Sequence, residues 1–259
     1  MESGDRAPEA VTGALDDSAD RRKSVIRLAA GSVFLISVAF VQSPGLLVAD
    51  TKFDLAVDPA GFLGKALHLW DPTTAFGQVQ NQAYGYLWPM GPFFWLGHEI
   101  GLPGWAIQRA WLALVMVVAF LGAALVTRAL GVRRDAAVIL AGFLYALSPR
   151  MITDLGPHSI EVWPMALAPW VLLPLIVGSR RGSPRQAAAL SALAIGMIGG
   201  VNAAATSAVL PMGVLWLLTR ERGKRRRILL TWWPTFCLLA TLCWLVLLFI
   251  FGRSSPPFL

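Results

Sequence analysis

Long apolar blocks separated by short basic clusters constrain this 259-residue chain more than any other feature. A helix of about 20 apolar residues is long enough to cross the hydrocarbon core of a bilayer. Soluble domains rarely carry such blocks, and 56% of all residues here are hydrophobic. The sequence therefore predicts an all-α, polytopic membrane protein.

The apolar blocks predict about seven membrane spans. One block, Ala187–Leu218, begins and ends beside basic clusters, so we interpret it as a helical hairpin that turns near the Gly-Gly-Val-Asn of residues 199–202. The other expected spans are Val25–Val48, Gly104–Leu130, Ala136–Pro149, Val162–Gly178 and Leu229–Phe251.

Four basic clusters set the expected orientation. They lie at residues 21–23, 133–134, 180–185 and 220–227, and the positive-inside rule places all four in the cytoplasm, with the N-terminus inside and the C-terminus outside. The net charge is +7, but this clustering is typical of topology signals, so nucleic acid is excluded as a partner. The run RERGKRRR at 220–227 is interpreted as such a signal in contact with anionic lipid; a docking site for an acidic cytoplasmic protein is the weaker alternative.

The two ends of the chain differ from the blocks between them. Residues 1–24 are expected to be a disordered cytoplasmic tail, because the first twenty are small, polar and acidic and lack the basic start of a signal peptide. Residues 25–259 are expected to form one membrane module with outer loops at 49–103 and 149–162. The chain stops just after the last apolar block, and we expect a truncated part of a larger protein.

The segment GLLVADTKFDLAVDPAGFLGKALHLWDP, residues 45–72, carries four aspartates beside the first span. If the first helix continues, Asp50 and Asp54 share one of its faces. A carboxylate at the membrane boundary is costly unless it is hydrated, paired or functional. The pattern alone favours a hydrated charge, partly neutralised by Lys52, over a general base that faces a lipid-borne substrate.

Residues 58–71 predict a short amphipathic helix. Asp58 suits the N-cap and Pro59 the first helical position, and Asp71-Pro72 ends the segment. Four apolar residues recur at helical spacing: Phe62, Ala66, Leu69 and Trp70. We expect this helix to lie in the plane of the membrane surface.

The stretch GQVQNQAYGYLWPMGPFFWLGH combines amide and aromatic side chains. Amides offer paired donors and acceptors, and aromatic rings offer flat apolar faces, a mixture that suits sugar rings. An aromatic belt at the membrane surface is the alternative, and it is slightly favoured for any single aromatic. The candidate sugar-binding residues are Gln80, Asn81, Tyr84 and Trp88.

The second outer loop, SPRMITDLGPHSIEVWP, concentrates charged residues. Arg150 is a candidate phosphate ligand, and His158 is a candidate donor to phosphate or ligand to a metal. Glu161 completes the set of candidate binding residues. Pairing of these charges among themselves, for instance Arg150 with Asp154, is equally favoured.

These segments resemble the N-terminal part of the actinobacterial α-(1→3)-arabinofuranosyltransferases. The resemblance rests on ADTKFDLAVDPAGFLGKALHLWDP, FGQVQNQAYGYLWPMGPFFWLGH, YALSPRMITDLGPHSIEVWPMALAPWVLLPLI and GGVNAAAT, and it covers most of residues 45–220. It implies a GT-C transmembrane bundle in the plasma membrane with its active site on the periplasmic face. It also implies a pentosyltransferase that uses decaprenylphosphoryl-arabinofuranose as donor and cell-wall arabinan as acceptor.

The same resemblance implies roles for individual residues. In this fold the catalytic base is usually an acidic residue just after the first span, and Asp50 matches that place best, with Asp54 second. The implied reaction is an inverting displacement in which Lys52, Arg150 or His158 neutralises the leaving phosphate. Some enzymes of this fold hold a divalent cation at this place, so the resemblance admits one, but no ligand set in this sequence demands it, and no other cofactor is implied. A non-catalytic protein that binds or moves a polyprenyl-linked sugar is the alternative to an enzyme.

Overall fold

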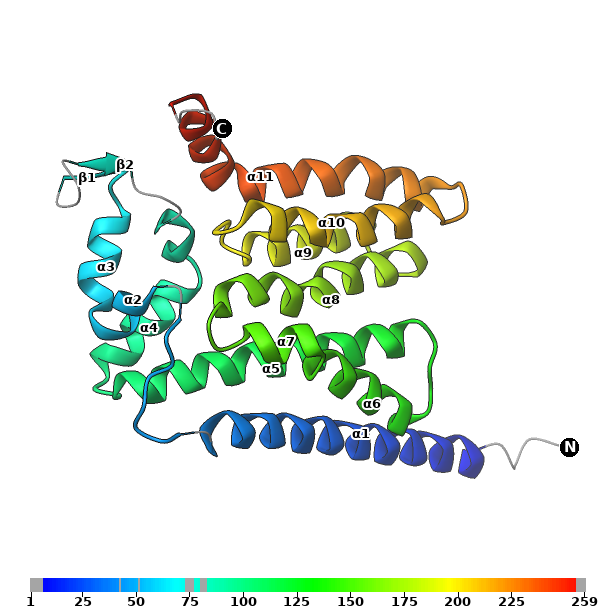
Figure 1. Ribbon diagram of the computed structural model, residues 1–259. Coiled ribbons are helices and arrows are strands. Elements are labelled where there is room, and N and C mark those ends of the chain that lie inside the picture. The colour runs from blue at the N-terminus through cyan, green and yellow to red at the C-terminus, as the bar shows by residue number, and fades with distance from the viewer. Residues whose placement is uncertain (1–6, 42, 51, 73–76, 80–82, 255–259) are drawn as a thin grey trace, which may run out of the picture.

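The apolar blocks fold into a bundle of helices that lie side by side (Figure 1). The computed structural model describes residues 7–41, 43–50, 52–72, 77–79 and 83–254. The helices of the bundle are α1 (Ala7–Val41), α5 (Gly104–Ala129), α6 (Asp135–Ala146), α7 (Pro149–Asp154), α8 (Ser159–Arg180), α9 (Pro184–Gly196), α10 (Ala203–Leu218) and α11 (Lys224–Ser254).

Four of these helices contain a stretch that is long and apolar enough to cross a membrane. The stretches are Arg21–Val41, Gly104–Ala129, Ser159–Arg180 and Lys224–Ile250. The helices α6 and α10 are apolar but shorter. The predicted all-α membrane architecture is thereby confirmed for the described residues, and the number and direction of the crossings stay predictions.

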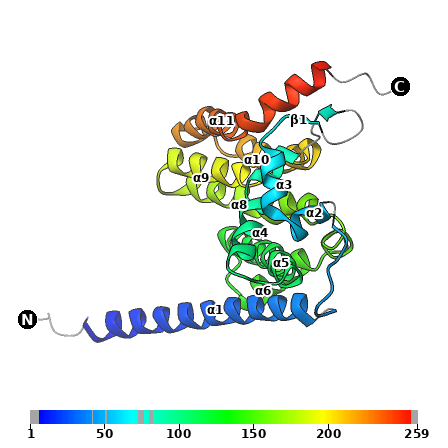
Figure 2. The ribbon, with the colours of Figure 1, turned by 90° about the vertical axis from the view of Figure 1, so that its left-hand side faces the viewer.

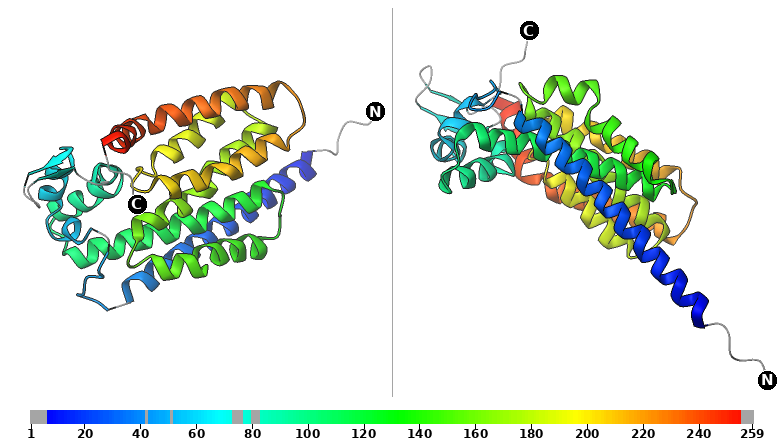
Figure 3. Two further views of the ribbon diagram at one scale, coloured as in Figure 1. Left: turned by 45° about the horizontal axis from the view of Figure 1, so that its top comes forward. Right: turned by 90° about the horizontal axis from the view of Figure 1, so that it is seen from below.

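Helix α8 lies at the centre of the bundle. It packs against α5, α9 and α10, while α11 packs on α9 and α1 packs on α5. Two glycines permit close approach of helices, because a Cβ atom at Gly178 would meet Ala187 and one at Gly122 would meet the Trp170 ring. Seen from below, α1 runs along the outside of the green helices α5 and α6 (Figure 3).

Small elements gather at one end of the bundle, on the left in Figure 1 and facing the viewer in Figure 2. The strands pair in antiparallel fashion, with Trp70 opposite Val79. These elements are α2 (Phe53–Val57), α3 (Pro59–Ala66), β1 (Trp70–Asp71), β2 (Gln78–Val79), the 3₁₀ helix η1 (Ala83–Leu87) and α4 (Met90–Glu99).

The four basic clusters lie together at the opposite end. The N-terminal part of α1 and the α5–α6, α8–α9 and α10–α11 connections all lie on the right of Figure 1. The α9–α10 turn lies at the left, as predicted for a hairpin. Gly199 and Gly200 have φ angles of 86° and 74°, and the Asn202 side chain accepts from the Ala205 N–H at 3.0 Å.

Helix α1 ends at Val41, so the predicted continuation to Val48 is wrong. Pro44 has no N–H and disfavours helical backbone at the residue before it. Ser43 and Gly45 accordingly have φ angles of 40° and 82°. At its other end α1 begins at Ala7, inside the segment 1–24 for which composition predicts disorder, and that disorder stays a prediction.

Near the second predicted outer loop, too, a proline causes a helix boundary to differ from the predicted one. Helix α6 ends at Ala146 rather than at Pro149, because Pro149 excludes helical backbone at Ser148 and instead starts α7. Helix α8 begins at Ser159, so much of the segment 149–162 is helical and not a loop.

Helix α8 contains three internal prolines and still continues to Arg180. Pro169 cannot donate to the carbonyl of Met165, four residues earlier. The Tyr145 hydroxyl of α6 donates to that carbonyl at 2.7 Å. A side chain from a neighbouring helix thus replaces the missing hydrogen bond, as helices inside a membrane require.

The predicted helix at 58–71 is correct at its start and wrong at its end. The Asp58 side chain accepts from the Gly61 N–H at 2.9 Å, and Pro59 is the first helical residue. The helix stops at Ala66, and Trp70 belongs to β1, where its ring packs against Gly77. Trp70 therefore does not continue an apolar helix face.

Candidate functional site

Asp50 is held against the start of α8 by two hydrogen bonds. The Ser159 hydroxyl donates to Asp50 Oδ2 at 2.5 Å, and the Ser159 N–H donates to Oδ1 at 3.3 Å. Ser159 is fully buried and is the first residue of α8. The carboxylate thus satisfies an N–H in the first turn of a helix, where these groups have no partner within the helix.

Trp111 extends this contact into the core. Its Nε1 donates to Ser159 Oγ at 3.1 Å, and its ring lies 5.1 Å from the ring of Trp163. Because the Ser159 oxygen accepts from Trp111, the serine proton is left to point at Asp50. Trp111, Ser159 and Asp50 form one chain of hydrogen bonds that fixes the orientation of the carboxylate.

The chain leading to Asp50 is held by two buried polar residues of α5. The Gln108 amide donates to the Val48 carbonyl and accepts from the Val48 N–H, both at 2.8 Å. Arg109 Nη2 donates to the Leu46 carbonyl at 3.3 Å, and within the described part of the chain Arg109 Nε has no hydrogen-bond partner. Gln108 and Arg109 are each 2% exposed.

Sequence reasoning missed Gln108, Trp111 and Ser159 as supports of the site. Two adjacent polar residues inside the apolar block GWAIQRAWLALVM were the available signal for Gln108 and Arg109. Such residues within a span are costly unless they find partners, which here are main-chain groups of the 46–48 segment. Ser159 gave no comparable signal, because its partners are distant in the sequence.

Asp54 does not share a helical face with Asp50, so that expectation is wrong. Residues 46–50, after the break at Pro44, belong to no helix or strand, whereas Asp54 lies in the first turn of α2. Asp54 is exposed, and Lys52 is half-buried at the N-cap of α2. Asp50 and Asp54 are therefore in different surroundings, one fixed at α8 and one facing outward.

The contact of Asp50 with Ser159 brings the two predicted outer loops together. His158 is next to Ser159 and is about half exposed, and Glu161 lies in the first turn of α8. Arg150 forms an ion pair with Asp154 at 2.6 Å, as the charge-pairing interpretation of this loop predicted. His158 Nδ1 lies 4.0 Å from the same carboxylate.

The aromatic stretch is described only in part, because Gln80 and Asn81 lie outside the described residues. Tyr84 and Trp88 lie in and just after η1. Trp88 is 53% exposed, and its Nε1 donates to Met197 Sδ at 3.1 Å. Partial burial raises the pKa of the Tyr84 phenol above its ordinary value, so this hydroxyl stays protonated in neutral solution.

Two apolar cavities meet at Met197. One of about 540 Å³ has Tyr84, Trp88 and Trp244 in its wall, and the other, of about 330 Å³, has Trp111 and Trp163. Met197 lines both, and its carbonyl accepts from Trp163 Nε1 at 2.7 Å. Trp111 therefore touches an apolar cavity on one side and the Ser159–Asp50 pair on the other.

A metal site is not formed by the residues that the structure describes. No three of their His, Cys, Asp and Glu side chains gather closely enough to hold an ion. Asp154, the carboxylate nearest to His158, is already paired with Arg150. The divalent cation that the resemblance admits thus finds no ligand set among these residues.

Comparison with known proteins adds independent evidence. Residues 34–259 match the family model of the α-(1→3)-arabinofuranosyltransferase N-terminal GT-C domain. An α-(1→3)-arabinofuranosyltransferase of Mycolicibacterium smegmatis (strain ATCC 700084 / mc(2)155) is 45% identical over 223 residues. One of Mycobacterium tuberculosis (strain ATCC 25618 / H37Rv) is 44% identical over 227 residues.

The matched region spans 86% of this chain but only 16% of the length of each of these two relatives. Its fold is similar to the cryo-EM structure of the arabinofuranosyltransferase AftD from mycobacteria, with a TM-score of 0.82 and 47% identity. That match covers 87% of this chain and 17% of the solved one. The similarity thus concerns the N-terminal part of much longer proteins.

Proposed function

Because this chain belongs to the α-(1→3)-arabinofuranosyltransferase family through its GT-C domain, we propose that it provides the catalytic membrane domain of such an enzyme. The proposed reaction moves arabinofuranose from decaprenylphosphoryl-arabinofuranose to a 3-hydroxyl of cell-wall arabinan. The observation that carries the proposal is the fixed carboxylate of Asp50 beside α8, between the two outer segments.

Asp50 is proposed as the general base. It would take the proton of the acceptor 3-hydroxyl while that oxygen forms a bond to the anomeric carbon of the donor. The bond from the anomeric carbon to the phosphate oxygen breaks in the same step, so the configuration inverts and polyprenyl phosphate leaves as an anion. A carboxylate has about four lone-pair sites, so Asp50 can accept from Ser159 and from the acceptor at once.

Asp54 remains the second candidate for the base. Its exposure leaves it open to a hydroxyl acceptor, but within the described part of the chain no hydrogen bond fixes its carboxylate as Ser159 fixes that of Asp50. A base must be held in place to gain from orientation, which favours Asp50.

The leaving phosphate needs a cation. His158 and Arg150 lie on the segment that leads into Ser159, and Lys52 follows Asp50 by two residues, so all three are proposed to face the donor phosphate. Arg150 forms an ion pair with Asp154, and this pair holds the guanidinium group in place. Stabilisation of charge that develops on the leaving group is usually the largest catalytic contribution.

The remaining substrate contacts are proposed from the polarity of the side chains that line the two cavities. The apolar cavities around Met197 suit the prenyl chain of the donor, because their walls are built from Trp and aliphatic side chains. Tyr84 and Trp88, which line the larger cavity, are proposed to contact a sugar ring together with Gln80, Asn81 and Glu161. This arrangement would keep the prenyl chain in an apolar groove and the sugar at the polar end.

The proposed membrane orientation has seven crossings, with Asp50 on the periplasmic side of the plasma membrane. The grouping of all four basic clusters at the opposite end supports it (Figure 1). In the 220–227 run, Arg225 and Arg226 donate to main-chain carbonyls at the ends of α8 and α10. Those bonds favour a structural and topological role for the run over docking of an acidic protein.

The test of this proposal uses membranes that contain the enzyme, decaprenylphosphoryl-arabinofuranose labelled in the sugar and a synthetic arabinan acceptor. Linkage analysis of the labelled product should show a new (1→3) bond with inverted anomeric configuration. Binding of the donor lipid without any labelled product would instead favour a non-catalytic carrier of polyprenyl-linked sugars.

A further inference from the structure

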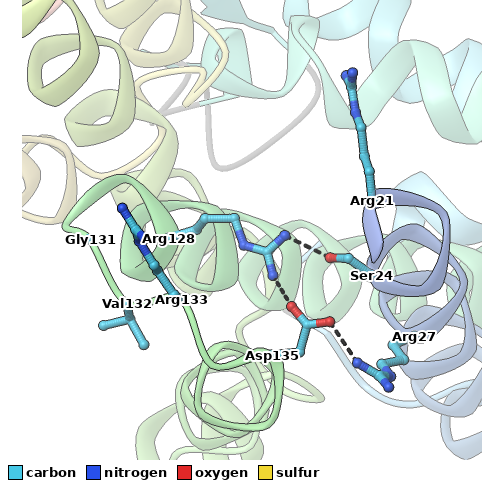
Figure 4. A pocket seen from close by; sticks show the side chains of 8 residues that line it. All are labelled: Arg21, Ser24, Arg27, Arg128, Gly131, Val132, Arg133 and Asp135. Carbon is cyan, nitrogen blue, oxygen red and sulfur yellow. Dashed lines mark hydrogen bonds and ion pairs between the residues drawn. The ribbon is translucent and has the colours of Figure 1, made fainter. Parts of the chain in front are cut away.

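A basic cavity of about 590 Å³ lies at the end of the bundle that is opposite Asp50 (Figure 4). The start of α1, the end of α5 and the turn into α6 form its wall. Four arginines and a single carboxylate line it: Arg21, Arg27, Arg128 and Arg133 with Asp135. The proposed glycosyl transfer gives none of these residues a part.

The single carboxylate is already used by two of the arginines. Asp135 pairs with Arg27 at 2.7 Å and, on its other oxygen, with Arg128. Arg128 also donates to the buried Ser24 hydroxyl at 2.7 Å. Figure 4 shows Arg128 between Ser24 and Asp135, with its guanidinium group fixed by both.

Arg21 and Arg133 are left without an ion pair to any side chain that the structure describes. One lies on α1 and the other in the α5–α6 connection, so the cavity separates them. Four arginines and one aspartate leave an excess of three positive charges around it. The sequence places Asp16, Asp17 and Asp20 just before Arg21, and their side chains lie outside the described part.

The second basic cavity at this end of the bundle is different. There Arg180, Arg225 and Arg226 donate to the main-chain carbonyls of Ala129, Gly182 and Leu217, and the guanidinium group of Arg220 lies 4.1 Å from the centre of the Trp216 ring. Three of the five arginines that line it therefore satisfy main-chain carbonyls, and a fourth stacks on an aromatic ring. Within the described residues Arg21 and Arg133 have no such structural use, which points to an anion from outside the chain.

The surroundings of the cavity select a lipid as the source of that anion. Val132 lines the cavity itself, and Val25 of α1 and Leu130, which follows α5, are 60% and 50% exposed. A ligand here meets arginines and apolar side chains together, at the ends of two helices that are apolar enough to cross a membrane. We propose that this cavity binds the phosphate headgroup of an anionic membrane lipid, with its acyl chains along α1 and α5.

Such a headgroup would connect α1 with the turn between α5 and α6. Among the described polar contacts of this cavity, the hydrogen bonds of Arg27 with Asp135 and of Arg128 with Ser24 are the ones that join these elements. Arginine matches phosphate oxygens with two parallel hydrogen bonds. The side chains of Arg21 on α1 and Arg133 beside α6 point away from Asp135 in Figure 4, and we expect them to turn toward a phosphate in the cavity that both line. Basic pockets between membrane helices on the cytoplasmic side commonly bind such headgroups. The bound lipid would thus add to the packing of α1 on α5.

The experiment is native mass spectrometry of the protein purified in a neutral detergent and titrated with phosphatidylglycerol. We expect saturable binding that falls about thirtyfold in the double variant Arg21→Gln/Arg133→Gln, because each basic residue contributes a factor of about five near an anionic headgroup. Phosphatidylcholine should not bind with comparable affinity. Inorganic phosphate should not displace phosphatidylglycerol at millimolar concentration.

The matched control is Arg134→Gln/Arg181→Gln, which removes the same charge at two exposed residues outside the cavity. It should retain the wild-type affinity within about twofold, and the melting temperatures of both double variants without lipid should agree with that of the wild type. Equal losses in the two double variants would overturn the proposal in favour of general surface charge. Displacement by inorganic phosphate alone would overturn the assignment to a lipid.

Discussion

The hydroxyl of Ser159 donates a hydrogen bond of 2.5 Å to the carboxylate of Asp50, although the two residues are 109 positions apart in the chain. This bond joins the non-helical segment after α1 to the first turn of α8. Trp111 donates to the same hydroxyl from α5. Two helices, α5 and α8, thereby determine where one carboxylate lies.

Replacing Ser159 by alanine should show how much the fixed orientation of the Asp50 carboxylate contributes to the rate, because the carboxylate itself remains. We expect kcat to fall about tenfold, because the carboxylate loses its fixed direction. Stability should fall by about 1–3 kcal/mol, because the buried Trp111 N–H loses its acceptor. Steady-state kinetics and thermal unfolding of the purified variant measure the two effects.

Ser179 offers a matched control near the other end of α8. Its hydroxyl accepts from Trp216 Nε1 at 3.3 Å, so Ser179→Ala removes a similar bond far from Asp50. This variant should lose stability but keep its kcat. A Ser159→Ala enzyme with wild-type kcat would contradict the positioning role.

Gln108 is expected to support the site through the main chain. Gln108→Leu leaves the N–H and the carbonyl of Val48 without their amide partner, which should cost about 2 kcal/mol of stability. Because Val48 lies two residues before Asp50, kcat should fall as well, with little change in KM for the acceptor. The exposed Gln186→Leu variant should change neither quantity, and a Gln108→Leu enzyme as stable as the wild type would rule out this support.

The Tyr145–Met165 bond can be tested by a double-mutant cycle. Tyr145→Phe should destabilise the bundle by about 1 kcal/mol, because the Met165 carbonyl loses its donor. Combined with Pro169→Ala, the same change should cost less, because the introduced alanine supplies the helical N–H that proline lacks. Unfolding free energies of the four proteins give the coupling, and strictly additive effects would show that the tyrosine does not replace the missing bond.

Trp244 should affect the donor through its prenyl chain. Trp244→Ala removes part of the wall of the larger apolar cavity, and we expect KM for the decaprenyl donor to rise about tenfold. A donor with a much shorter prenyl chain should be affected much less. Trp95, which is 41% exposed on α4 and outside this cavity, gives the control variant Trp95→Ala. Equal effects on long and short donors would argue against a prenyl site.

Local signals in the sequence predicted the elements that depend on neighbouring residues. The cap of α3 at Asp58 and the α9–α10 turn at Gly199 and Gly200 follow from turn and cap chemistry alone. The span at α5 follows from its long apolar block. Pro44 and Pro149 were equally local signals, and giving them full weight would have corrected the ends of α1 and α6.

The support of Asp50 could not be read from the sequence in the same way. Whether a juxtamembrane aspartate is hydrated or held depends on the helix that packs against it, and Ser159 reaches it only after α5, α6 and α7 have folded back. The resemblance directed attention to Asp50, but it carried no information on Gln108 or Trp111. These residues become visible as supports only when α5 is placed beside the 46–50 segment.

The central claim is that Asp50, and not Asp54, removes the acceptor proton. The most direct measurement compares Asp50→Asn and Asp54→Asn enzymes in membranes, with labelled decaprenylphosphoryl-arabinofuranose and an arabinan acceptor at equal protein levels. We predict a loss of (1→3) product of about a thousandfold for Asp50→Asn with donor binding retained, and near-normal product for Asp54→Asn. Normal product from Asp50→Asn would contradict the account and leave the Ser159–Asp50 bond with a structural role alone.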